Sequence, residues 1–334
     1  MSILVTGGAG YVGSHCVAAL TARGYDVAVL DDLSTGHREA VQGARLYLGS
    51  LSDCAFIDNV FTQEKVEAVI HFAACSLVGE SMSDPGKYFT NNFAGTVNLL
   101  ETMREHNIPY IIFSSTAAVY GETEISPITE ECPKEPTNPY GESKLMVEKA
   151  LKWFDSAYGI KYTALRYFNV AGAIQNASIG EDHNPETHLI PLVLQAALNN
   201  ESAKIFGNDY PTHDGTCIRD YIYVMDLACA HVNALDYLRS GGQSDVFNLG
   251  IGHGYSVLEI IESARRVTGK AIPAEILPRR GGDPAVLIAS GKKARRTLDW
   301  QPKYTDIDEI IQTAWHGISR QTDHMFCVMI IWLI

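Results

Sequence analysis

The sequence lacks the cysteine pattern of a disulfide framework or a zinc site. Its seven cysteines form an odd, scattered set without a C-x-x-C pair. Such a set is typical of a protein in a reducing compartment. No two histidines have zinc-ligand spacing either, so no metal is predicted. A basic leader with a cleavage site is also missing, because "MSILVTGG" is expected to form a strand that runs directly into glycines. We therefore expect a cytoplasmic protein.

Positive charge is scarce in this chain. Its 334 residues include 26 Lys and Arg against 39 Asp and Glu, a net charge of −13. Nucleic acids and anionic membranes bind clustered Lys and Arg, so neither is an expected partner. An anionic ligand would have to be held by a few local cations or by backbone N–H groups.

A long membrane-spanning run is missing as well. The chain ends in "MFCVMIIWLI" (325–334), ten apolar residues where a helical span needs about 20. A packed terminal strand and a scar of an altered reading frame are equally open for this stretch, and a membrane anchor is less favoured. Residues 321–334 are therefore treated as an atypical apolar tail.

The first half of the sequence contains a regular alternation of short apolar runs and amphipathic stretches. Such alternation is typical of βαβ units and a parallel sheet. Runs that are apolar throughout, such as "AVIHFAA" (68–74), suit strands covered on both faces. The expected strands are 3–7, 26–32, 45–49, 67–74, 110–115 and 162–170, and the expected helices are 11–23, 53–64, 84–106 and 140–156. The pattern predicts an α/β fold with a doubly wound, Rossmann-type parallel sheet.

The second half is richer in loops such as "GNDYPTHDGT" (207–216) and "PRRGGDPA" (278–285). Helices are expected over 189–199, 226–239, 256–269, 290–298 and 306–319. Residues 1–170 are predicted to form the sheet domain, to which segments near 220–250 return, with a strand over 245–252. Residues 171–320 are predicted to form a smaller mixed α/β lobe over the carboxyl edge of the sheet, where such sheets bind ligands.

The stretch "TGGAGYVG" (6–13) follows the first expected strand and opens the first expected helix. Gly7, Gly10 and Gly13 allow a tight turn, close approach of the backbone to a pyrophosphate, and close packing of the helix on the strand. Eighteen residues past Gly13, Asp31 ends the second expected strand, where it can accept from both hydroxyls of an adenosine ribose. A carboxylate there repels a 2′-phosphate, so the domain is expected to bind NAD and not NADP. The alternative for Asp31 is a helix N-cap.

The stretch "NPYGESKLMVEK" (138–149) sets Tyr140 and Lys144 four residues apart, on one face of an expected helix. A nearby ammonium lowers the pKa of a phenol, whose usual value is about 10. Together with a positive nicotinamide, Lys144 is expected to bring the pKa of Tyr140 toward neutral pH. The alternative is a surface aromatic ring packed on a lysine stem.

The stretch "FSSTAAVYG" (113–121) places Ser114, Ser115 and Thr116 at the end of the fifth expected strand. The Gly-rich turn and the helix of Tyr140 should emerge at the same sheet edge. A hydroxyl, a phenol and a lysine beside a nicotinamide form a proton-transfer set for the interconversion of alcohols and ketones.

Several of these motifs together resemble the extended short-chain dehydrogenase/reductase family. They are T-G-G-x-G-x-x-G, Asp31, "HFAA" (71–74), "NN" (91–92), "SSTAAVYG" and Y-x-x-x-K. "RYFNVAGA" (166–173), "IFGNDYPTHDGTCIRDYIYVMDLA" (205–228) and "PRRGGDPA" are more closely similar to the UDP-glucose 4-epimerase branch of that family. The resemblance runs from residue 2 to about residue 315.

The resemblance implies a tightly held NAD and the reversible interconversion of UDP-glucose and UDP-galactose. In such enzymes the tyrosine matching Tyr140 removes the proton of the sugar 4-hydroxyl while hydride passes from C4 to the nicotinamide. The 4-keto sugar then turns about its phosphate linkage and takes the hydride back on its other face. The residue matching Thr116 hydrogen-bonds the 4-oxygen, and the one matching Lys144 reaches the nicotinamide ribose.

The resemblance also implies two sets of contact residues. The cofactor set is Gly7, Gly10, Tyr11, Val12, Gly13, Asp31, Ser50, Leu51, Phe72, Ala73, Ala74, Ser76, Asn91, Ser114, Tyr140, Lys144 and Phe168. The substrate set is Thr116, Asn169, His188, Leu189, Phe206, Arg219, Tyr221, Arg280 and Asp283. Arg219 and Arg280 would supply the cations for a diphosphate. Their alternative is ion pairing with Asp220 and Asp283.

Three positions depart from the family pattern. Ser50 stands where the family usually has an aspartate near the adenine, and Ser76 where some members have a lysine. Leu287 falls at the wall position that helps to decide whether an N-acetylated sugar fits. Its intermediate size leaves UDP-N-acetylhexosamines as alternative, poorer substrates.

The family resemblance also implies a homodimer, formed through a four-helix bundle. The pairing helices would be 84–106 and 140–156, with the apolar residues Leu99, Leu100, Leu145 and Met146.

Two rival functions are less well supported by the residues. A nucleotide-sugar 4,6-dehydratase needs an Asp-Glu pair just after the active-site threonine, where this chain has Ala117 and Ala118. A non-catalytic NAD-binding protein would usually lack the tyrosine and lysine, yet Thr116, Tyr140 and Lys144 are all present.

Overall fold

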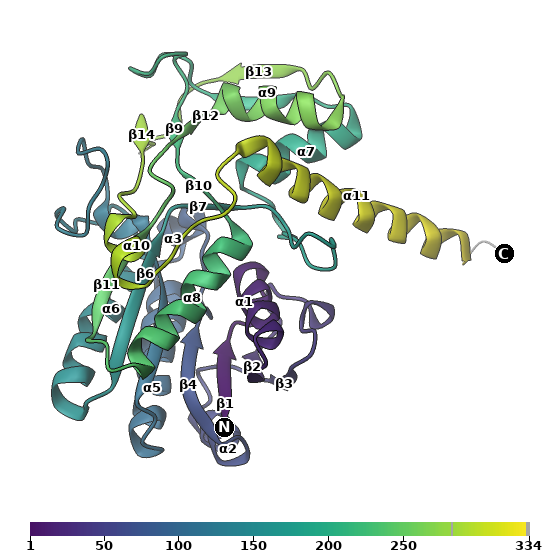
Figure 1. The fold of residues 1–334 in the computed structure, drawn as a ribbon. Helices are drawn as coiled ribbons and strands as arrows, with labels where there is room; N and C mark the ends of the chain where they lie inside the picture. Colours follow the sequence, from purple (N-terminus) through teal and green to yellow (C-terminus); the bar gives the residue numbers. More distant parts are fainter. Residues whose placement is uncertain (282, 332–334) are drawn as a thin grey trace.

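The computed structural model describes residues 1–281 and 283–331, with side chains described as far as residue 319. A parallel sheet with helices on both faces forms the larger part of the molecule (Figure 1). Its seven strands lie in the order β11-β6-β5-β4-β1-β2-β3. These strands are β1 (Ser2–Thr6), β2 (Asp26–Asp31), β3 (Arg45–Leu48), β4 (Val66–His71), β5 (Tyr110–Thr116), β6 (Lys161–Tyr167) and β11 (Asp245–Leu249). The predicted doubly wound α/β fold is confirmed, and the strand predicted over 245–252 returns to this sheet as β11.

The sheet is apolar on both faces because successive residues of a strand point to opposite sides. Ile3 and Val5 of β1 pack on the face covered by α1 and α8, whereas Leu4 packs on the face covered by α2, α5 and α6. The bounds of these helices are α1 (Tyr11–Ala22), α2 (Cys54–Gln63), α5 (Gly95–Glu105), α6 (Pro139–Tyr158) and α8 (Val224–Arg239). Two separate cores therefore hold the sheet rigid between its helices.

The smaller lobe contains short strands in three small sheets and three helices among the described residues. The sheets are β7 (Asn169–Ala171) with β10 (Tyr221–Tyr223), β12 (Tyr255–Ser256) with β9 (Ile218–Arg219) and β14 (Val286–Leu287), and β8 (Ala203–Phe206) with β13 (Ala274–Leu277). The helices are α7 (Leu189–Asn199), α9 (Val257–Thr268) and α11 (Ile307–Ile331), whereas α10 (Lys292–Thr297) packs against β11 and the core of the large sheet. The division of the chain into a domain of residues 1–170 and one of residues 171–320 stays a prediction.

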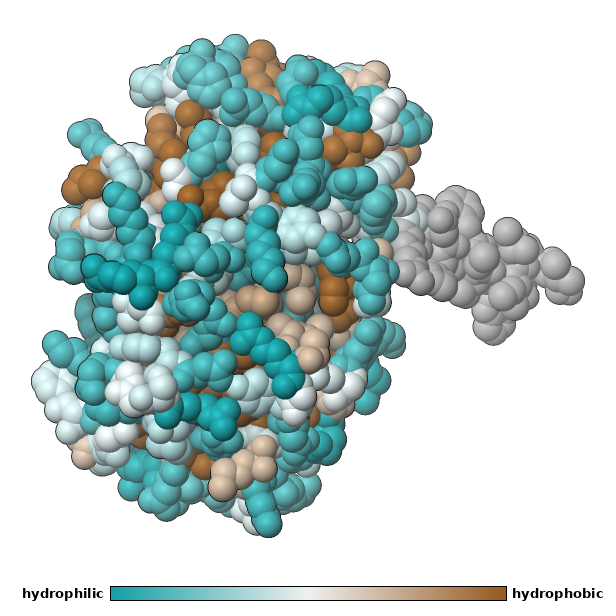
Figure 2. All heavy atoms as spheres, viewed as in Figure 1, coloured by the Kyte–Doolittle hydropathy of each residue, from teal (hydrophilic) through white to brown (hydrophobic). Residues whose placement is uncertain are grey.

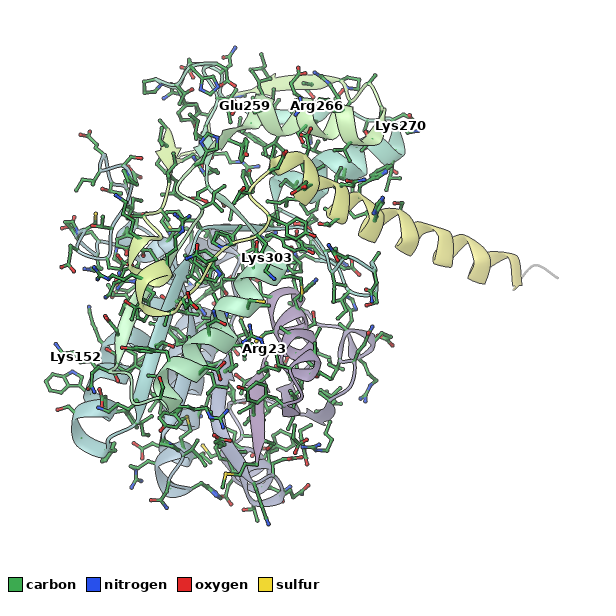
Figure 3. All side chains as sticks on the ribbon, viewed as in Figure 1. Arg23, Lys152, Glu259, Arg266, Lys270 and Lys303 are labelled. Atoms are coloured by element: carbon green, nitrogen blue, oxygen red, sulfur yellow. The ribbon has the colours of Figure 1, made fainter. Side chains whose placement is uncertain are left out.

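Helix α9 shows how the sequence sets the ends and the faces of these helices. Ser256 caps its first turn in a capping box with Glu259, and Gly269 ends it in the left-handed conformation. Ile260 and Ile261 are fully buried, while charged residues, Glu259 and Arg266 among them, project from the outer side (Figure 3). Charged and polar residues likewise cover most of the face shown in Figure 2, and apolar residues emerge among them in small groups.

The single strand predicted over 162–170 is in fact two strands. β6 ends at Tyr167, and β7 begins at Asn169 and pairs with β10 in the smaller lobe. Phe168 between them is where the chain leaves the large sheet. Alternating apolar residues continue across this point, so periodicity alone could not reveal the change of sheet.

The helix predicted over 84–106 is interrupted. It consists of α4 (Pro85–Tyr88), a π-helical turn over Phe89–Ala94, and α5. Such π segments often occur at functional sites, and this one contains Asn91 and Asn92. The remaining short elements are α3 (Val78–Ser83) and the 3-10 turns Arg38–Ala40 and Ala117–Tyr120.

The apolar tail differs from the terminal strand considered above. Helix α11 continues through Ile331, so that alternative is wrong for residues 325–331. Residues 332–334 lie outside the described residues. Among the described helices, none combines the length and the apolar character that a bilayer crossing requires.

Three of the four leucine and methionine residues predicted for a pairing surface lie in the chain's own core. Leu99, Leu100 and Leu145 are 0%, 0% and 7% exposed, because they pack between their helices and the sheet or the adjoining loops. Met146 is partly exposed, and Trp153, seven residues further along α6, is 71% exposed. Residues seven apart lie on one helical face, so the outward face of α6 carries Met146 and Trp153.

Candidate active site

The turn between β1 and α1 has the geometry of an anion cradle. Gly7 has φ +73°, and a Cβ there would lie 2.5 Å from the backbone nitrogen of Ala73; a Cβ on Gly13 would lie 2.1 Å from the Gly7 oxygen. Gly10 is different, because the atom nearest to its Cβ would be 3.5 Å away. Gly10 is also the N-cap of α1 and supplies no side-chain cap, so backbone N–H groups of the first turn stay available for a ligand. These features fit a dinucleotide pyrophosphate.

Asp31 braces this turn from the end of β2. Its Oδ2 accepts from the N–H of Ala9 at 2.9 Å, and its Oδ1 accepts from the N–H of Leu33 at 2.8 Å. The next helical turn has His37 as its N-cap, so the N-cap alternative for Asp31 is wrong. Each carboxylate oxygen retains a further lone pair for a ribose hydroxyl. Burial raises the pKa of Asp31, and the two N–H bonds oppose that rise.

Further residues of the predicted cofactor set surround the turn. Ala73 follows β4 and donates its N–H to Thr6 O at 3.1 Å, which places the 72–74 segment beside Gly7. Tyr11 Oη donates to Gly172 O at 2.6 Å. The remaining members are placed as follows: Val12 packs at the edge of the core, Ser50 Oγ accepts from the N–H of Ser52, Leu51 is buried, Phe72 lies against the ring of His231, and Phe168 follows β6.

The asparagine pair in the π segment has divided roles. Asn92 Oδ1 accepts from the N–H of Cys75 at 2.8 Å, and its Nδ2 donates to Cys75 O at 2.9 Å and to Ser143 Oγ at 3.1 Å. Asn92 therefore ties the loop after β4, including Ser76, to α6. Asn91, the predicted cofactor contact, donates to Asn92 Oδ1 at 3.1 Å. The sequence did not distinguish the structural residue from its neighbour.

The predicted proton-transfer residues come together at the carboxyl end of β5. The Thr116 hydroxyl lies close enough to Tyr140 to act on its pKa, and Lys144 Nζ donates to Ser114 O at 2.8 Å. Ser114 Oγ is hydrogen-bonded to the phenol of Tyr167. Lys144 is only 3% exposed and lies 4.9 Å from the centre of the Phe113 ring. A phenol, a threonine hydroxyl and a buried lysine thus share one edge of the sheet.

The expectation that Lys144 and a nicotinamide together lower the pKa of Tyr140 stays a prediction, and Lys144 is not among the groups that shift the pKa of Tyr140 here. Burial raises the pKa of Tyr140, and only the hydrogen bond with Thr116 opposes that rise. Lys144 points its ammonium at the Ser114 carbonyl, and burial lowers its own pKa to about 7. Lys144 is fully charged only below neutral pH, so it stabilises the phenolate of Tyr140 only weakly.

This buried lysine predicts a pH dependence of stability. Its folded pKa of about 7 lies below the ordinary 10.5, so the unfolded chain binds more protons between these values. The free energy of unfolding should therefore rise with pH through this window, by up to about 1.4 kcal/mol per pH unit from Lys144. Lys144→Met should remove that rise. Urea unfolding of the unaltered chain and the variant at about pH 7, 8 and 9 measures how the free energy of unfolding changes with pH. Equal changes in the two chains would refute the lowered pKa of Lys144.

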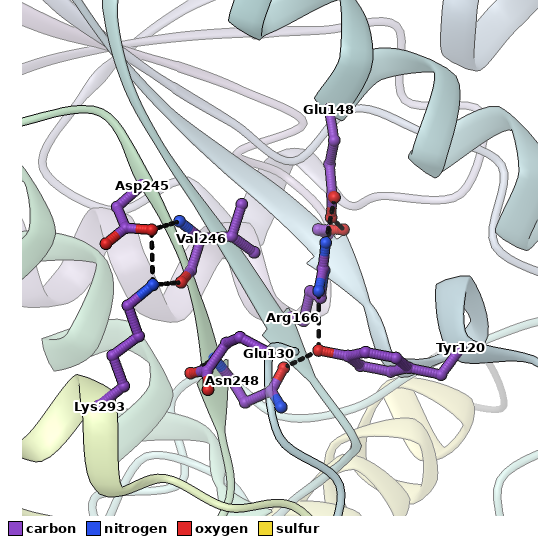
Figure 4. Close-up of polar contacts among 9 residues, drawn as sticks. Tyr120, Glu130, Glu148, Arg166, Asp245, Val246, Asn248 and Lys293 are labelled. Carbon is purple, nitrogen blue, oxygen red and sulfur yellow. Dashed lines mark hydrogen bonds and ion pairs between the residues drawn. The ribbon is translucent and has the colours of Figure 1, made fainter. Parts of the chain in front are cut away.

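Helix α6 is held in register by a buried network (Figure 4). Asn138 caps its first turn, Pro139 begins it and Gly159 ends it. Glu148 lies four residues after Lys144, and its Oε1 accepts from Ser115 Oγ at 2.6 Å and from Arg166 Nε at 2.9 Å.

The same network reaches β11, the edge strand of the sheet, where Asn248 is the register partner of Arg166. Arg166 Nη1 donates to the Tyr120 hydroxyl at 2.7 Å, and that hydroxyl donates to Asn248 Oδ1 of β11 at 2.6 Å. The sequence analysis missed these residues. A signal was available, since Glu148 continues the four-residue spacing of Tyr140 and Lys144 on one helical face.

The predicted substrate residues fall into pairs. Arg219 donates to Asp283 Oδ1 at 3.1 Å and to the carbonyls of Ile218 and Pro284. Arg280 lies 3.8 Å from the centre of the Phe206 ring. Ion pairing between Arg219 and Asp283 is therefore present. The alternative pairing of an arginine with Asp220 is wrong, because the Asp220 carboxylate accepts from the N–H groups of Ile251, Gly252 and Ala289 instead.

The side-chain amide of Asn169 lacks a hydrogen-bond acceptor among the described residues. Thr116 pairs with Tyr167 in the sheet, and Asn169 lies two residues further along, at the same edge. Its Nδ2 is buried and has no hydrogen-bond partner among the described residues. Buried donors are rarely left unpaired, so this amide is suited to a ligand acceptor. Tyr221 pairs with Asn169 across β7 and β10 and is buried, and Leu287 packs in the same cluster as Phe168.

His188 lies against two neighbouring acids, and its assignment as a substrate contact stays a prediction. It is the N-cap residue of α7 but makes no side-chain cap, and Leu189 begins the helix. Its Nδ1 lies 3.0 Å from Glu181 Oε1 and 2.9 Å from Glu186 Oε1. Burial opposes charge on this ring, but bonds to the two carboxylates raise the pKa of His188 to about 10. Nδ1 of His188 thus faces the two acids.

A doubly wound sheet with a Gly-rich turn and a Thr–Tyr–Lys set defines the class of dinucleotide-binding enzymes that act on alcohol and carbonyl groups. The chain belongs to the NAD dependent epimerase/dehydratase family, whose model matches residues 3–250.

Similar proteins carry more specific names. The UDP-glucose 4-epimerase of Lacticaseibacillus casei is 57% identical over 318 residues, which cover 95% of this chain and 96% of the relative. A crystal structure of a UDP-glucose 4-epimerase has a TM-score of 0.95 at 54% identity and covers 96% of this chain and 98% of its own. The Bifidobacterium longum UDP-glucose 4-epimerase, in complex with NAD+ and UDP, has a TM-score of 0.90 at 38% identity and covers 96% and 98%.

Proposed function

We propose that this chain is an enzyme that interconverts UDP-glucose and UDP-galactose through transient oxidation at C4 of the sugar, with NAD as its cofactor. The observation that carries the proposal is the meeting of Thr116, Tyr140 and buried Lys144 at the carboxyl edge of the sheet that also holds the Gly-rich turn. The names and bound ligands of the relatives support the same substrate and cofactor.

The residues that would hold NAD are those of the cradle. The backbone of Gly7, Gly10 and Gly13 faces the pyrophosphate, and Asp31 faces the adenosine ribose. When bound, NAD accepts a hydride from C4 of the sugar and returns it. We assign this binding to residues 1–170 with segments of 220–250, and substrate binding to residues 171–320.

Tyr140 is proposed as the proton-transfer residue. Its phenolate removes the proton of the 4-hydroxyl, and its phenol later returns the proton to the 4-oxygen of the ketone. Thr116 donates to the same oxygen and holds it in place. Because burial raises the pKa of Tyr140, ionisation has to be assisted by positive charge that arrives with the ligands. Lys144 positions the ribose and keeps the Ser114 carbonyl satisfied.

The substrate lobe supplies the side chains that are proposed to bind the nucleotide. Arg219 and Arg280 are the cations proposed for the diphosphate, and the guanidinium fork matches phosphate oxygens. The unpaired Nδ2 of Asn169 is proposed as a donor to the substrate. Phe206 supports Arg280 from below its guanidinium plane.

The direct experiment follows the conversion of UDP-galactose by the purified chain. Incubation without added NAD should yield UDP-glucose, detected by chromatography, until the ratio of the two sugars is constant. Absorbance should show no net accumulation of NADH, because the reaction is redox-neutral. Absence of UDP-glucose even when NAD is supplied would reject the proposal.

Arg280→Ala is expected to raise KM for UDP-galactose by roughly 10-fold with little change in kcat, because a uniform binding contact is lost. Arg279→Ala is the matched control. Arg279 also lies over an aromatic ring, at 4.0 Å from Tyr210, but it is paired with Asp209. Steady-state kinetics of both variants decide the assignment, and an equal rise of KM in the two would remove Arg280 from the diphosphate site.

We also propose a cytoplasmic homodimer that pairs through α5 and α6. The free thiols of the described cysteines support a reducing location, and the exposed Trp153 supports the pairing surface. Light scattering should give twice the chain mass of 36.6 kDa. Trp153→Glu should shift the mass toward that of one chain, while the adjacent exposed change Lys152→Glu should not. A monodisperse monomer of the unaltered chain would contradict the pairing.

A further inference from the structure

A second cluster of ionisable side chains lies in the segment between β7 and α7. Glu181, His183, Glu186 and His188 each contribute one oxygen or nitrogen atom, and the four atoms lie within 4.8 Å of one another. None of the steps proposed above needs two carboxylates and two imidazoles at one point. The cluster therefore calls for a role of its own.

The distances within the cluster match a small coordination shell. His183 Nδ1 lies 3.3 Å from Glu181 Oε1 and 3.5 Å from Glu186 Oε2, and His188 Nδ1 lies 3.0 Å and 2.9 Å from the same two carboxylates. A tetrahedral Zn²⁺ with bonds of about 2.0–2.1 Å has ligand-to-ligand edges of about 3.3–3.4 Å. With Glu181 Oε1 and Glu186 Oε1 as the two oxygen ligands, the distances of 3.3, 3.0 and 2.9 Å lie within about 0.5 Å of those edges.

Burial and hydrogen bonding point to the same conclusion. The side chains of Glu181 and Glu186 are only 7% and 6% exposed, and their carboxylates are stabilised by positive charge at this point, from the imidazolium rings of His183 and His188 or from a metal ion that replaces their protons. Nδ1 of His183 is buried and makes no hydrogen bond among the described residues, although it faces both acids. Glu186 Oε1 also accepts from the N–H groups of Thr187 and His188, each at 2.7 Å, as outer-shell donors hold a ligating carboxylate.

We propose that Glu181, His183, Glu186 and His188 bind one divalent transition-metal ion, with Zn²⁺ as the best match. Two imidazole nitrogens disfavour Mg²⁺ and Ca²⁺, which take oxygen ligands. A mixed set of two nitrogens and two oxygens with tetrahedral spacing suits Zn²⁺. The side chain of His188 is 51% exposed and leaves a path by which the ion reaches the site.

The position of the cluster indicates a structural role. His188 adjoins the first turn of α7, and the ring of His183 lies 6.1 Å from that of Tyr11, at the start of α1. The same loop is attached to α1 by the bond from Tyr11 to Gly172 and by the N–H of Ile174, which donates to His15 Nε2 at 3.2 Å. A site with four protein ligands is closed, as structural zinc sites are. The ion would clip the 172–188 loop between the two helices.

The spacing of residues in the sequence did not predict this cluster. The two histidines are five residues apart in "EDHNPETH" (181–188), a segment without helix or strand. Spacing rules for metal sites assume helical or zinc-finger geometry, and neither applies here. The prediction of no metal rested on those rules.

The test uses the full-length chain, treated with a chelator and desalted. Titration with ZnCl₂ in a calorimeter should show one ion per chain. Titration with CoCl₂ should give the intense visible absorbance of tetrahedral Co²⁺, without the near-ultraviolet band of cobalt bound to thiolate. His183→Gln and Glu181→Gln should each weaken Zn²⁺ binding by at least about tenfold.

His213→Gln is the matched control. His213 also faces two carboxylates, Asp214 at 3.7 Å and Glu259 at 3.5 Å, but the surroundings supply no second imidazole. Its substitution should leave Zn²⁺ binding unchanged. Zn²⁺ affinity in His183→Gln equal to that of the unaltered chain, an octahedral Co²⁺ spectrum, a thiolate band, or no binding at all would each overturn the proposal. If His183→Gln fails to fold, the Co²⁺ spectrum of the unaltered chain decides alone.

Discussion

Replacing Tyr140 by phenylalanine is expected to lower turnover of UDP-galactose by roughly 10²–10⁴, the range typical for the loss of a general acid or base. The change removes only the hydroxyl of Tyr140, which lies near Thr116 at the end of β5. The ring can keep its packing, including its edge contact with Tyr88 at 6.4 Å. The variant should therefore fold and still bind NAD. Initial rates from the chromatographic assay measure the loss.

Tyr167→Phe provides the comparison for that result. Tyr167 is, like Tyr140, a half-buried tyrosine at the site, but its hydroxyl is hydrogen-bonded to Ser114 Oγ. Its loss should change turnover by less than about 10-fold, since no proton-transfer role is removed. Near-full activity of Tyr140→Phe, or equal losses in the two variants, would refute the role of Tyr140.

Replacing Arg166 by methionine is expected to lower the free energy of unfolding by about 3–5 kcal/mol. Arg166 and Glu148 are 4% and 6% exposed, and their paired atoms approach to 2.5 Å (Figure 4). Without the guanidinium, the Glu148 carboxylate is left buried with the hydroxyl of Ser115 as a remaining donor. Urea unfolding followed by circular dichroism measures the loss.

Arg279→Met tests whether burial is the cause. Arg279 forms an ion pair with Asp209, but those side chains are 42% and 72% exposed. Exposed pairs contribute about 0–1 kcal/mol. Losses of similar size in the two variants would show that Glu148 is not the isolated buried charge that the structure indicates. Glu148 lies on the same helical face as Lys144, so Arg166→Met should also lower kcat. This decrease should be smaller at lower temperature, because a larger fraction of the variant is folded there.

The sequence predicted most of the sheet and the Gly-rich turn because both depend on local patterns. Apolar runs of strand length and glycines at fixed spacing are visible within a short window. The break at Phe168 depends instead on which distant strand pairs with Asn169. That partner, Tyr221, lies 52 residues away in the sequence. No local pattern contains such information.

The electrostatics of the site were harder to predict than its residues. The spacing of Tyr140 and Lys144 correctly placed both residues on one helical face, but it could not reveal that Lys144 would reach the Ser114 carbonyl. Depth of burial, which sets the pKa of both groups, is a property of the whole fold. The cluster around His183 was missed for a related reason, because its acids and imidazoles meet only when the loop folds back on itself.

The placement of β11 has a consequence for how this protein is made. The strand consists of residues 245–249, yet it pairs with β6, which ends at residue 167. On the ribosome, β6 therefore remains an unpaired edge until residue 249 of 334 has emerged. Open edges of this kind recruit other strands. The nascent chain is thus most exposed to mispairing during that interval, and a gene fragment that stops near residue 170 should yield an aggregating product.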